Sequence, residues 1–486
     1  MRSISRFIQP ENVISITIVN DCEENDKINL FHSLFDIARF TRLRSLTIHR
    51  IKDTNLEHFL ENLSTSSLTS LSIESSEQEH IRTWDLVSSA SLRWNLRKLC
   101  ISNMNFMAKY ISWSDQYKLE HLEFSNCTYS DYLLILRHLP NLRTLVIQNC
   151  IIDDNQTCLT LSASIVLASL KSLTITNCSL APQHFELLIS SIPSLHHLKL
   201  ISHRERHAEL NPHENPIRDL GIEHLADALS YNSTLTTLNL DRTQIENKGA
   251  QYLANALSNN RTLITLELAR NQITELGVKY IANALSSNRT LATLNLAGNQ
   301  IGAVGAQHLA KALQNNTTLT KLDICANQIG TTEVQHLANF LHTNTGLIKM
   351  HLASNRISDE GSQYLANALS NNSVLTTLNL TDNQIEGQGV QYFANALSNN
   401  TTLTTLDLHF NQIGDQGAQH LANVLQNNTT LMTLDIHWNQ IGELGAQHLA
   451  NALRNNSTLH KLVLIYVNHI SSTLLDELQK NDDRIA

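Results

Sequence analysis

The chain has 486 residues, a formal net charge of -9 at pH 7 and a pI near 6.2. Its length exceeds one ordinary compact core, and its acidic balance argues against nucleic acid as the main partner, because phosphate recognition needs a basic stripe. The seven cysteines lack the dense, even spacing of a secreted disulfide scaffold. Residues 1–20 contain no signal-peptide core, and no run of about 18 apolar residues provides a membrane span. We therefore expect a cytoplasmic protein with neither nucleic acid nor membrane as a partner.

The first half of the chain carries leucine-led strand patterns at irregular intervals. Val13 to Val19 predicts an opening strand ahead of them. The shorter intervals leave little room for a full α-helix, so we expect short or 3₁₀ segments on the outer side of these coils. The leucines that open the predicted strands are Leu43, Leu68, Leu96, Leu119, Leu142, Leu170 and Leu195.

Near the ends of three of these strands a cysteine follows an asparagine. We interpret the three cysteines as buried thiols stacked in a ladder. Metal binding, or a disulfide bridge between neighbouring coils, is the alternative. The pairs are Asn126-Cys127, Asn149-Cys150 and Asn177-Cys178.

A polar segment separates the two halves. Leu195 and Leu235 are farther apart than any neighbouring pair of strand-opening leucines before them. The excess falls in residues 203–216, a stretch rich in charged residues and histidine. We interpret this stretch as a solvated inserted loop; a pH- or metal-sensitive contact through its histidines is the alternative.

From Leu235 onward the first leucine of one pattern recurs at a constant interval, which is the signature of a solenoid. In the copy that starts at Leu403, alternation over Leu406 to His409 predicts a short strand with its leucines turned inward. Gly417 to Leu425 then predicts a helix, because its leucines fall at helical spacing and its alanines let the backbone pack closely. One such unit cannot cover its own leucines, so stability must come from stacking on neighbours. The recurring leucines are Leu235, Leu263, Leu291, Leu319, Leu347, Leu375, Leu403, Leu431 and Leu459.

Each of these units also carries asparagines at fixed places. Asn411 falls at the end of the strand, where a buried side-chain amide can satisfy loop backbone groups that no ladder pairs. The pair Asn427-Asn428, after the helix, suits a left-handed helix end. The residues equivalent to Asn411, which we predict to form a ladder, are Asn271, Asn299, Asn327, Asn355, Asn383 and Asn439.

The repeated unit L-x-x-L-x-L-x-x-N-x-I-x-x-x-G-x-x-x-L-A-x-A-L resembles the leucine-rich repeat superfamily, and in particular its ribonuclease-inhibitor-like subtype, which also occurs in NOD-like receptors and the Ran GTPase-activating protein. The cysteine-bearing first half, over about residues 40–202, resembles the repeat subtype of F-box substrate receptors. The resemblance implies an α/β horseshoe with parallel strands on the concave face and helices on the convex face. It also implies protein binding on the concave face or rim.

We therefore predict one elongated body with four segments. Irregular repeats and an N-terminal cap occupy residues 1–202, and the inserted loop occupies 203–216. Regular repeats follow over 217–466, and a C-terminal cap with a short helix at Leu474–Lys480 occupies 467–486.

The predicted binding site lies where the array departs from its own pattern. Phe410, Trp438 and Tyr466 occupy one position in three adjacent units, where earlier units have Gly298, Ala326, Ser354 and Asp382. Large aromatic side chains beside charged groups on a rigid wall are typical of binding hot spots. The alternative is that the rings pack over the strand ends and shield the core. The predicted protein-binding residues are His409, Phe410, Asp435, His437, Trp438 and Tyr466.

Two aspartates and two histidines in the same region raise the question of a metal. Neighbouring strands lie about 4.8 Å apart, so Asp407, His409, Asp435 and His437 could converge on zinc. However, Asp323 occupies the same strand position in a unit that has no histidine two residues later, so aspartate at this position does not by itself indicate a metal site. We therefore predict no metal and no cofactor.

We expect a non-catalytic scaffold for protein–protein interactions, since no nucleophile set, phosphate-binding glycine loop or CxxC pair is present. Two alternatives remain open at this point. One is the substrate-recognition subunit of a ubiquitin ligase, with a ligase adaptor as partner, although no F-box is seen. The other is a GTPase-activating protein of the Ran-activator type, although the acidic tail of that family is not found.

Overall fold

The computed structural model describes residues 12–19, 40–51, 68–75, 87, 95–105, 117–151, 169–177, 183–190, 192–201, 217–464 and 469–485. It divides into two compact units, residues 1–217 and 218–486. The inserted loop predicted at 203–216 lies outside the described residues. Among the helices within these ranges, none is both long and apolar enough to cross a bilayer.

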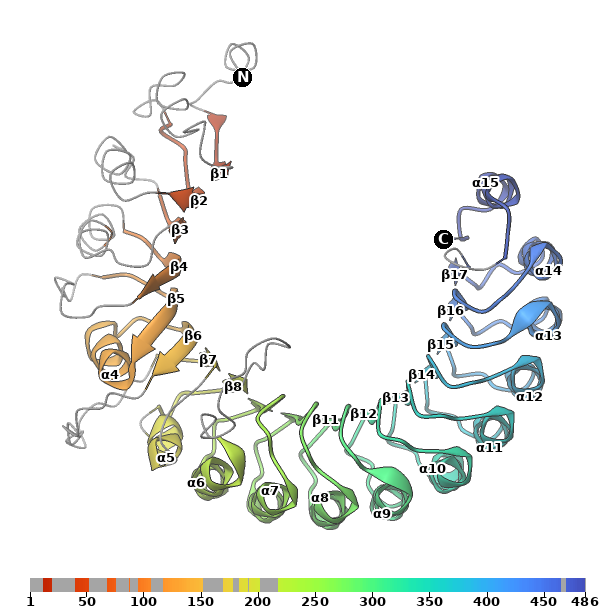
Figure 1. The fold of residues 1–486 in the computed structure, drawn as a ribbon, viewed down its shortest axis with the longest axis horizontal. Helices are drawn as coiled ribbons and strands as arrows, with labels where there is room; N and C mark the ends of the chain where they lie inside the picture. The colour runs from red at the N-terminus through yellow and green to blue at the C-terminus, as the bar shows by residue number, and fades with distance from the viewer. Residues whose placement is uncertain are drawn as a thin grey trace, which may run out of the picture. The chain divides into compact units, whose positions relative to one another are not determined.

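The first unit is a ladder of parallel strands, β1 to β8 (Figure 1). Each predicted leucine is followed two residues later by the start of a strand. Each strand pairs in parallel with the next along the chain. This confirms the eight predicted strands. They are β1 Ser15–Val19, β2 Ser45–Ile51, β3 Ser70–Ser75, β4 Lys98–Asn105, β5 His121–Thr128, β6 Thr144–Ile151, β7 Ser172–Thr176 and β8 His197–Ile201, with helices α4 Tyr129–His138 and α5 Gln183–Ser190.

The expectation of only short or 3₁₀ segments in this unit is wrong for α4, an ordinary ten-residue α-helix. Its coil has room because Thr128, the last residue of β5, is also the helix N-cap, so no loop intervenes. The Thr128 hydroxyl accepts from Asp131 N at 3.1 Å, and the Asp131 carboxylate accepts from Thr128 N at 3.2 Å. This reciprocal capping box starts the helix directly from the strand.

The asparagine-cysteine pairs lie side by side at the strand ends. Cys127 is paired in register with Cys150, and its side chain is buried, as predicted. The side chain of Asn177 donates to that of Asn149 at 2.8 Å, and Asn149 in turn donates to Asn126. The side chain of Cys150 and all of Cys178 lie outside the described residues.

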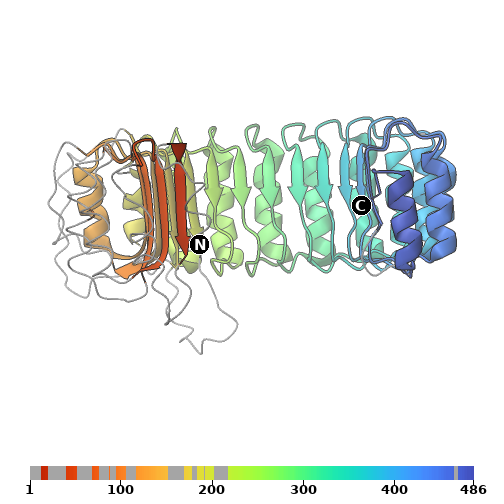
Figure 2. The same ribbon diagram turned by 90° about the horizontal axis from the view of Figure 1, so that it is seen from above.

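The second unit repeats one strand and one helix in each period of its leucine pattern (Figures 1 and 2). Within this unit the parallel strands line the concave side of the array and the helices lie on its convex side, as predicted. The strands are β9 Thr237–Asn239, β10 Thr265–Glu267, β11 Thr293–Asn295, β12 Lys321–Asp323, β13 Lys349–His351, β14 Thr377–Asn379, β15 Thr405–Asp407, β16 Thr433–Asp435 and β17 Lys461–Val463. The helices are α6 Arg218–Tyr231, α7 Asn247–Asn259, α8 Glu275–Ser287, α9 Gly302–Leu313, α10 Thr331–Thr343, α11 Asp359–Leu369, α12 Gly387–Leu397, α13 Gly414–Leu425, α14 Glu443–Leu453 and α15 Ser472–Asn481.

Leucines from each coil fill the space between the strand and helix layers. Leu403, Leu406 and Leu408 are fully buried, while Thr405 and Asp407 on the other strand face are half-buried. A side chain at Gly277 would place its Cβ 2.7 Å from both Ile273 Cγ2 and Asn247 Oδ1, so glycine is needed there for close packing between coils. Each coil therefore gains its cover from its neighbours.

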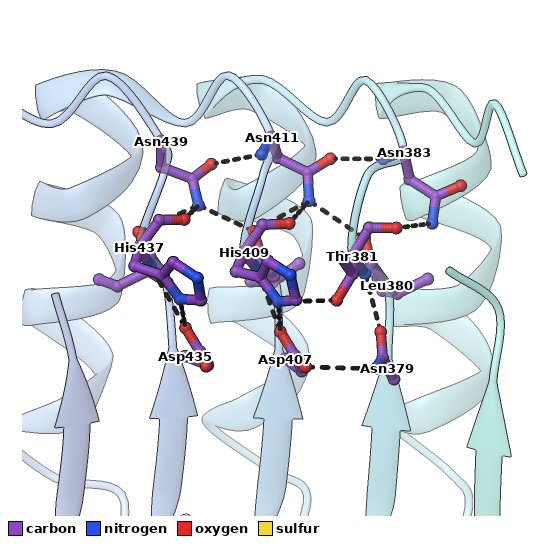
Figure 3. A network of polar contacts seen from close by, with 12 residues as sticks. Asn379, Leu380, Thr381, Asn383, Asp407, His409, Asn411, Asp435, His437 and Asn439 are labelled. Atoms are coloured by element: carbon purple, nitrogen blue, oxygen red, sulfur yellow. Dashed lines mark hydrogen bonds and ion pairs between the residues drawn. The ribbon is translucent and has the colours of Figure 1, made fainter. Parts of the chain in front are cut away.

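The predicted asparagine ladder at the strand ends is confirmed. The Asn411 amide nitrogen donates to the carbonyl oxygens of Leu380 at 3.0 Å and Leu408 at 2.9 Å, and its oxygen accepts from the backbone N–H groups of Asn383 and Ile385, both at 3.0 Å. Figure 3 shows three rungs of this ladder. One buried side chain thus satisfies four backbone groups in two coils.

The expectation of a left-handed helix end at Asn427-Asn428 is wrong. Neither residue has a positive φ; instead Asn428 is buried and forms a rung of a second ladder. Its amide nitrogen donates to Leu397 O at 2.9 Å, and its oxygen accepts from Leu431 N at 2.8 Å. Asparagine suits this place because its amide both donates and accepts. The buried rungs of this corner ladder are Asn260, Asn288, Asn316, Asn344, Asn372, Asn400, Asn428 and Asn456.

An arginine ends the corner ladder. Arg484 follows Asn456 at the same interval that separates the rungs, and its guanidinium donates to Leu453 O at 2.8 Å and Asn456 O at 2.5 Å. Asn456 likewise donates to the carbonyl oxygens of Leu425 and Asn428, which lie 31 and 28 residues before it, as Leu453 and Asn456 lie before Arg484. Asp482 holds the guanidinium with two further bonds, which lower the pKa of the Asp482 carboxyl. The helix predicted at Leu474–Lys480 is confirmed, because it lies within α15.

Candidate functional site

Strands β15 and β16 place the predicted aspartates and histidines on one face. Asp407 and His409 are two residues apart and face away from buried Leu408; Asp435 and His437 repeat this arrangement one coil later. Strands β15 and β16 are paired in register, so the equivalent side chains of the two coils lie next to each other.

These four side chains form an ordered polar network (Figure 3). The Nδ1 atom of His409 donates to Asp407 Oδ1 at 2.8 Å, and Nδ1 of His437 donates to Asp435 Oδ1. Asn379 donates to Asp407 Oδ2 at 3.2 Å, which extends the network to β14. Because a carboxylate only accepts, each imidazole carries its proton on Nδ1. The aspartates therefore fix both the tautomer and the orientation of the rings.

The two imidazole rings stack on each other, with centroids 4.4 Å apart and an angle of 7° between their planes. The possible ligand atoms of His409, Asp435 and His437 lie within 4.8 Å of one another. However, a metal ion lies in the plane of the imidazole that binds it, and two nearly parallel stacked rings cannot both meet that condition for one ion. The geometry therefore fits a rigid polar surface better than a zinc site.

Phe410 and Trp438 lie at the end of the strand face, in a backbone conformation that side chains of their type rarely adopt. Both have φ of 56°, in the left-handed region. Phe410 is 50% exposed and Trp438 43% exposed, and their ring centroids are 5.6 Å apart. Neither burial nor backbone preference explains the choice of aromatic residues here.

A groove of about 390 Å³ adjoins these two rings. One carboxylate and a row of glutamine amides line it beside the aromatic surface. Such a combination offers apolar contact area together with donors and acceptors that fix orientation. The lining residues are Asp382, Gln384, Phe410, Asn411, Gln412, Trp438, Gln440 and His469.

The structure brings five of the six predicted site residues together: His409, Phe410, Asp435, His437 and Trp438. The sixth, Tyr466, lies outside the described residues. The glutamines of the groove were not singled out from the sequence, although an Asn-Gln-Ile triplet recurs in most of the regular repeats. Only the fold shows that their side chains border the aromatic pair.

Comparisons with known proteins support the repeat assignment. Six segments match a family model described as Leucine Rich repeat: residues 231–254, 259–282, 287–310, 371–394, 399–422 and 427–450. The comparison with curated proteins gave no match.

Several solved structures are similar to this chain. The actin-binding site 2 of leiomodin-1 is 22% identical, with a TM-score of 0.28, covering 32% of this chain and 88% of that chain. An internalin (inlF) from Listeria monocytogenes is 17% identical, with a TM-score of 0.38, covering 82% and 88%. The Rad7 and Elc1 complex in yeast is 17% identical, with a TM-score of 0.43, covering 81% and 85%.

The matched segments and the alternation of parallel strands with helices define the class of protein: the chain folds as an α/β leucine-rich repeat solenoid. This fold typically serves as a non-catalytic binding scaffold. The predicted class of fold is thus confirmed.

Proposed function

We propose that the chain is a non-catalytic scaffold whose protein partner binds the aromatic rim, which we define as His409, Phe410, Asp435, His437, Trp438 and Tyr466. The observation that carries this proposal is the pair of half-exposed aromatic rings. The turn imposes a positive φ at this position in other coils too, as at Ala326 and Ser354, so the backbone conformation belongs to the repeat and the large aromatic side chains do not.

The surroundings of the rings favour a binding role over a shielding role. A ring that shields the core would itself be buried, whereas Phe410 and Trp438 are half exposed. Leu296 and Leu352 are fully buried in coils that carry Gly298 and Ser354 in place of a ring. The stacked histidines, each fixed by its aspartate, make the neighbouring surface rigid. A rigid surface loses little conformational entropy when a partner binds.

The test is Trp438→Gly, alone and with Phe410→Gly, in the full chain. Release of the left-handed strain offsets the lost ring contact, so the free energy of unfolding should change by less than about 1 kcal/mol. Affinity for the partner should fall by more than about 2 kcal/mol, as for a hot-spot residue. Affinity purification with mass spectrometry on wild type and the double variant identifies the partner, and titration calorimetry then measures its affinity.

Ala326 provides the matched control, because it occupies the same left-handed position three coils before Phe410 and its methyl group makes no hydrogen bond. Ala326→Gly should change neither affinity nor stability appreciably. If Trp438→Gly instead lowers the free energy of unfolding by about 3 kcal/mol or more, as loss of a core aromatic does, and leaves every captured protein bound, the rings only shield the core.

We also propose a ribonuclease-inhibitor-like subtype for the second unit, an F-box-type subtype for the first, and a reducing, cytoplasmic location. The location is supported by Cys100 and Cys325, which are free thiols. The segment boundaries at 202, 216 and 466 stay predictions. The ligase alternative predicts co-purification with a Skp1-type adaptor, and the GTPase-activator alternative predicts accelerated GTP hydrolysis by a small GTPase.

A further inference from the structure

A second cluster of possible metal ligands lies in the first unit, far along the sequence from the aromatic rim. The ligand atoms of Cys100, His121 and Glu123 all lie within 4.8 Å of one another. Strand register explains this placement: Cys100 in β4 is paired with Glu123 in β5, and His121 is two residues before Glu123 on the same face. Three different donor types thus meet on two adjacent strands.

We propose that Cys100, His121 and Glu123 bind a divalent transition-metal ion, with zinc as the best match. Zinc favours thiolate sulfur, imidazole nitrogen and carboxylate oxygen, at about 2.0–2.3 Å in tetrahedral geometry. Those bond lengths place neighbouring ligand atoms about 3.4 Å apart. The distance from His121 Nε2 to Glu123 Oε2 is 3.8 Å, so small side-chain rotations suffice.

The imidazole of His121 carries independent support. Within the described part of the chain its Nε2 atom is buried and has no hydrogen-bond partner. A buried polar atom without a partner costs about 1–3 kcal/mol and therefore needs an explanation. A metal ion bound at Nε2 would supply the missing partner.

The electrostatics leave one proton for the metal to displace. Burial raises the pKa of the Cys100 thiol to about 11, and the Glu123 carboxylate contributes to the rise, while Lys98 opposes it. Burial lowers the pKa of His121. The positive charge of Lys98 lowers it further, while the Glu123 carboxylate raises it by less than these two effects together lower it. At neutral pH the imidazole is therefore neutral and the thiol is protonated. Binding converts the thiol to a metal-bound thiolate and releases one proton to solvent.

Access to the cluster is open on one side. The side chain of His121 is 25% exposed and that of Glu123 is 32% exposed, while Cys100 is buried beneath them. Three protein ligands with an open side leave the fourth zinc position to water. The histidines of the aromatic rim differ, because both are stacked and bonded through Nδ1 to aspartates.

The experiment measures zinc and cobalt(II) binding to the full chain after treatment with chelator and reductant. We expect one zinc per chain, about one proton released per zinc at pH 7 in calorimetry across buffers, and a thiolate-to-cobalt charge-transfer band. Loss of an outer-shell partner alone typically costs about 10- to 100-fold in metal affinity. Cys100→Ser, which should also abolish the band, and His121→Gln should therefore each cost at least about 100-fold.

Two controls separate this cluster from other thiols and histidines. Cys127→Ser changes a buried thiol of β5, and His409→Ala with His437→Ala removes the stacked pair; both should leave zinc affinity and the cobalt band unchanged. If Cys100→Ser fails to fold by circular dichroism, His121→Gln and Glu123→Gln at half-exposed positions carry the test. No stoichiometric zinc binding, or binding that survives His121→Gln and Glu123→Gln, would overturn the proposal.

Discussion

The two units share a parallel strand ladder but differ in the polar bonds that join one coil to the next. In the second unit every rung of the corner ladder donates to a carbonyl 31 residues earlier. In the first unit, asparagines bond to each other across intervals of 23 and 28 residues. A constant period lets one side chain serve backbone groups of two coils, because those groups recur at a fixed offset. Where the interval varies, side chains reach carbonyl oxygens of the preceding coil at different offsets, as Asn141 does at Tyr117 and Thr176 does at Gln148.

Helix capping shows the same contrast. In the first unit Thr128 caps α4 from within its own coil. In the second unit Asp415, in the first turn of α13, accepts from Gly442 N at 2.6 Å and Gly445 N at 3.0 Å, at the start of α14. The free backbone N–H groups at the start of α14 are thus satisfied by a side chain of the preceding coil, which couples the two coils more tightly.

The largest expected effect is at the strand-end ladder. Asn355→Ala removes the acceptor of Asn327 N and Ile329 N and the donor to Ile324 O and Leu352 O. Because each buried group left unpaired costs about 1–3 kcal/mol, the free energy of unfolding should fall by at least about 3 kcal/mol. Denaturant titration with hydrogen exchange over residues 324–357 measures it.

Asn149→Ala in the first unit is the matched comparison. Its side chain bonds other asparagine side chains that are not fully buried, so the loss should be about 1 kcal/mol. Equal losses at Asn149 and Asn355 would contradict the idea that the constant period concentrates stability in the asparagine ladders.

Arg484→Ala should have the next largest effect, about 2 kcal/mol, because charged hydrogen bonds to Leu453 and Asn456 are lost at the end of the corner ladder. The bonds from Arg484 lower the pKa of Asp482 below its usual 3.8. The stability that this pair contributes is therefore fully present above about pH 4 and is lost as pH falls through the lowered pKa. Asp482→Asn should remove this acid dependence, as measured by hydrogen exchange of α15 between pH 5 and 2.5. An unchanged profile would contradict the assigned pair.

The smallest effect concerns the helix starts. Asp415→Ala should cost about 1–2 kcal/mol, and the faster amide exchange should appear at the start of α14, not in α13, which contains the substitution. Thr128→Ala should cost about 1 kcal/mol and affect α4 alone. Exchange confined to α13 after Asp415→Ala would show that the capping bond between coils is unimportant.

The sequence predicted the fold well because its main signals are local. Leucine alternation, the period and the strand-end asparagines each specify their own place in a coil, and stacking follows. The corner asparagines were misinterpreted, because Asn after a helix has two common uses and only the neighbouring coil decides between them. For Asn428 the deciding contact is the hydrogen bond from its side-chain amide to the Leu397 carbonyl oxygen in the preceding coil.

For the site, the sequence identified which residues break the pattern but not how they are held. The substitution of Phe and Trp for Gly, Ala, Ser and Asp was visible in the alignment of repeats. The left-handed backbone at Phe410 and Trp438 was not, because it depends on the turn into the next element. The cluster of Cys100 and His121 was also invisible, since its members are brought together by strand register across an irregular interval.

The constant offset of the asparagine bonds has a consequence for how the regular array can change in length. An insertion of one residue in any coil would shift a donor away from its carbonyl in both ladders at once. Removal or gain of one whole period restores every contact. Viable length variants of this region should therefore differ by whole copies, so that genetic duplication or loss acts on complete coils.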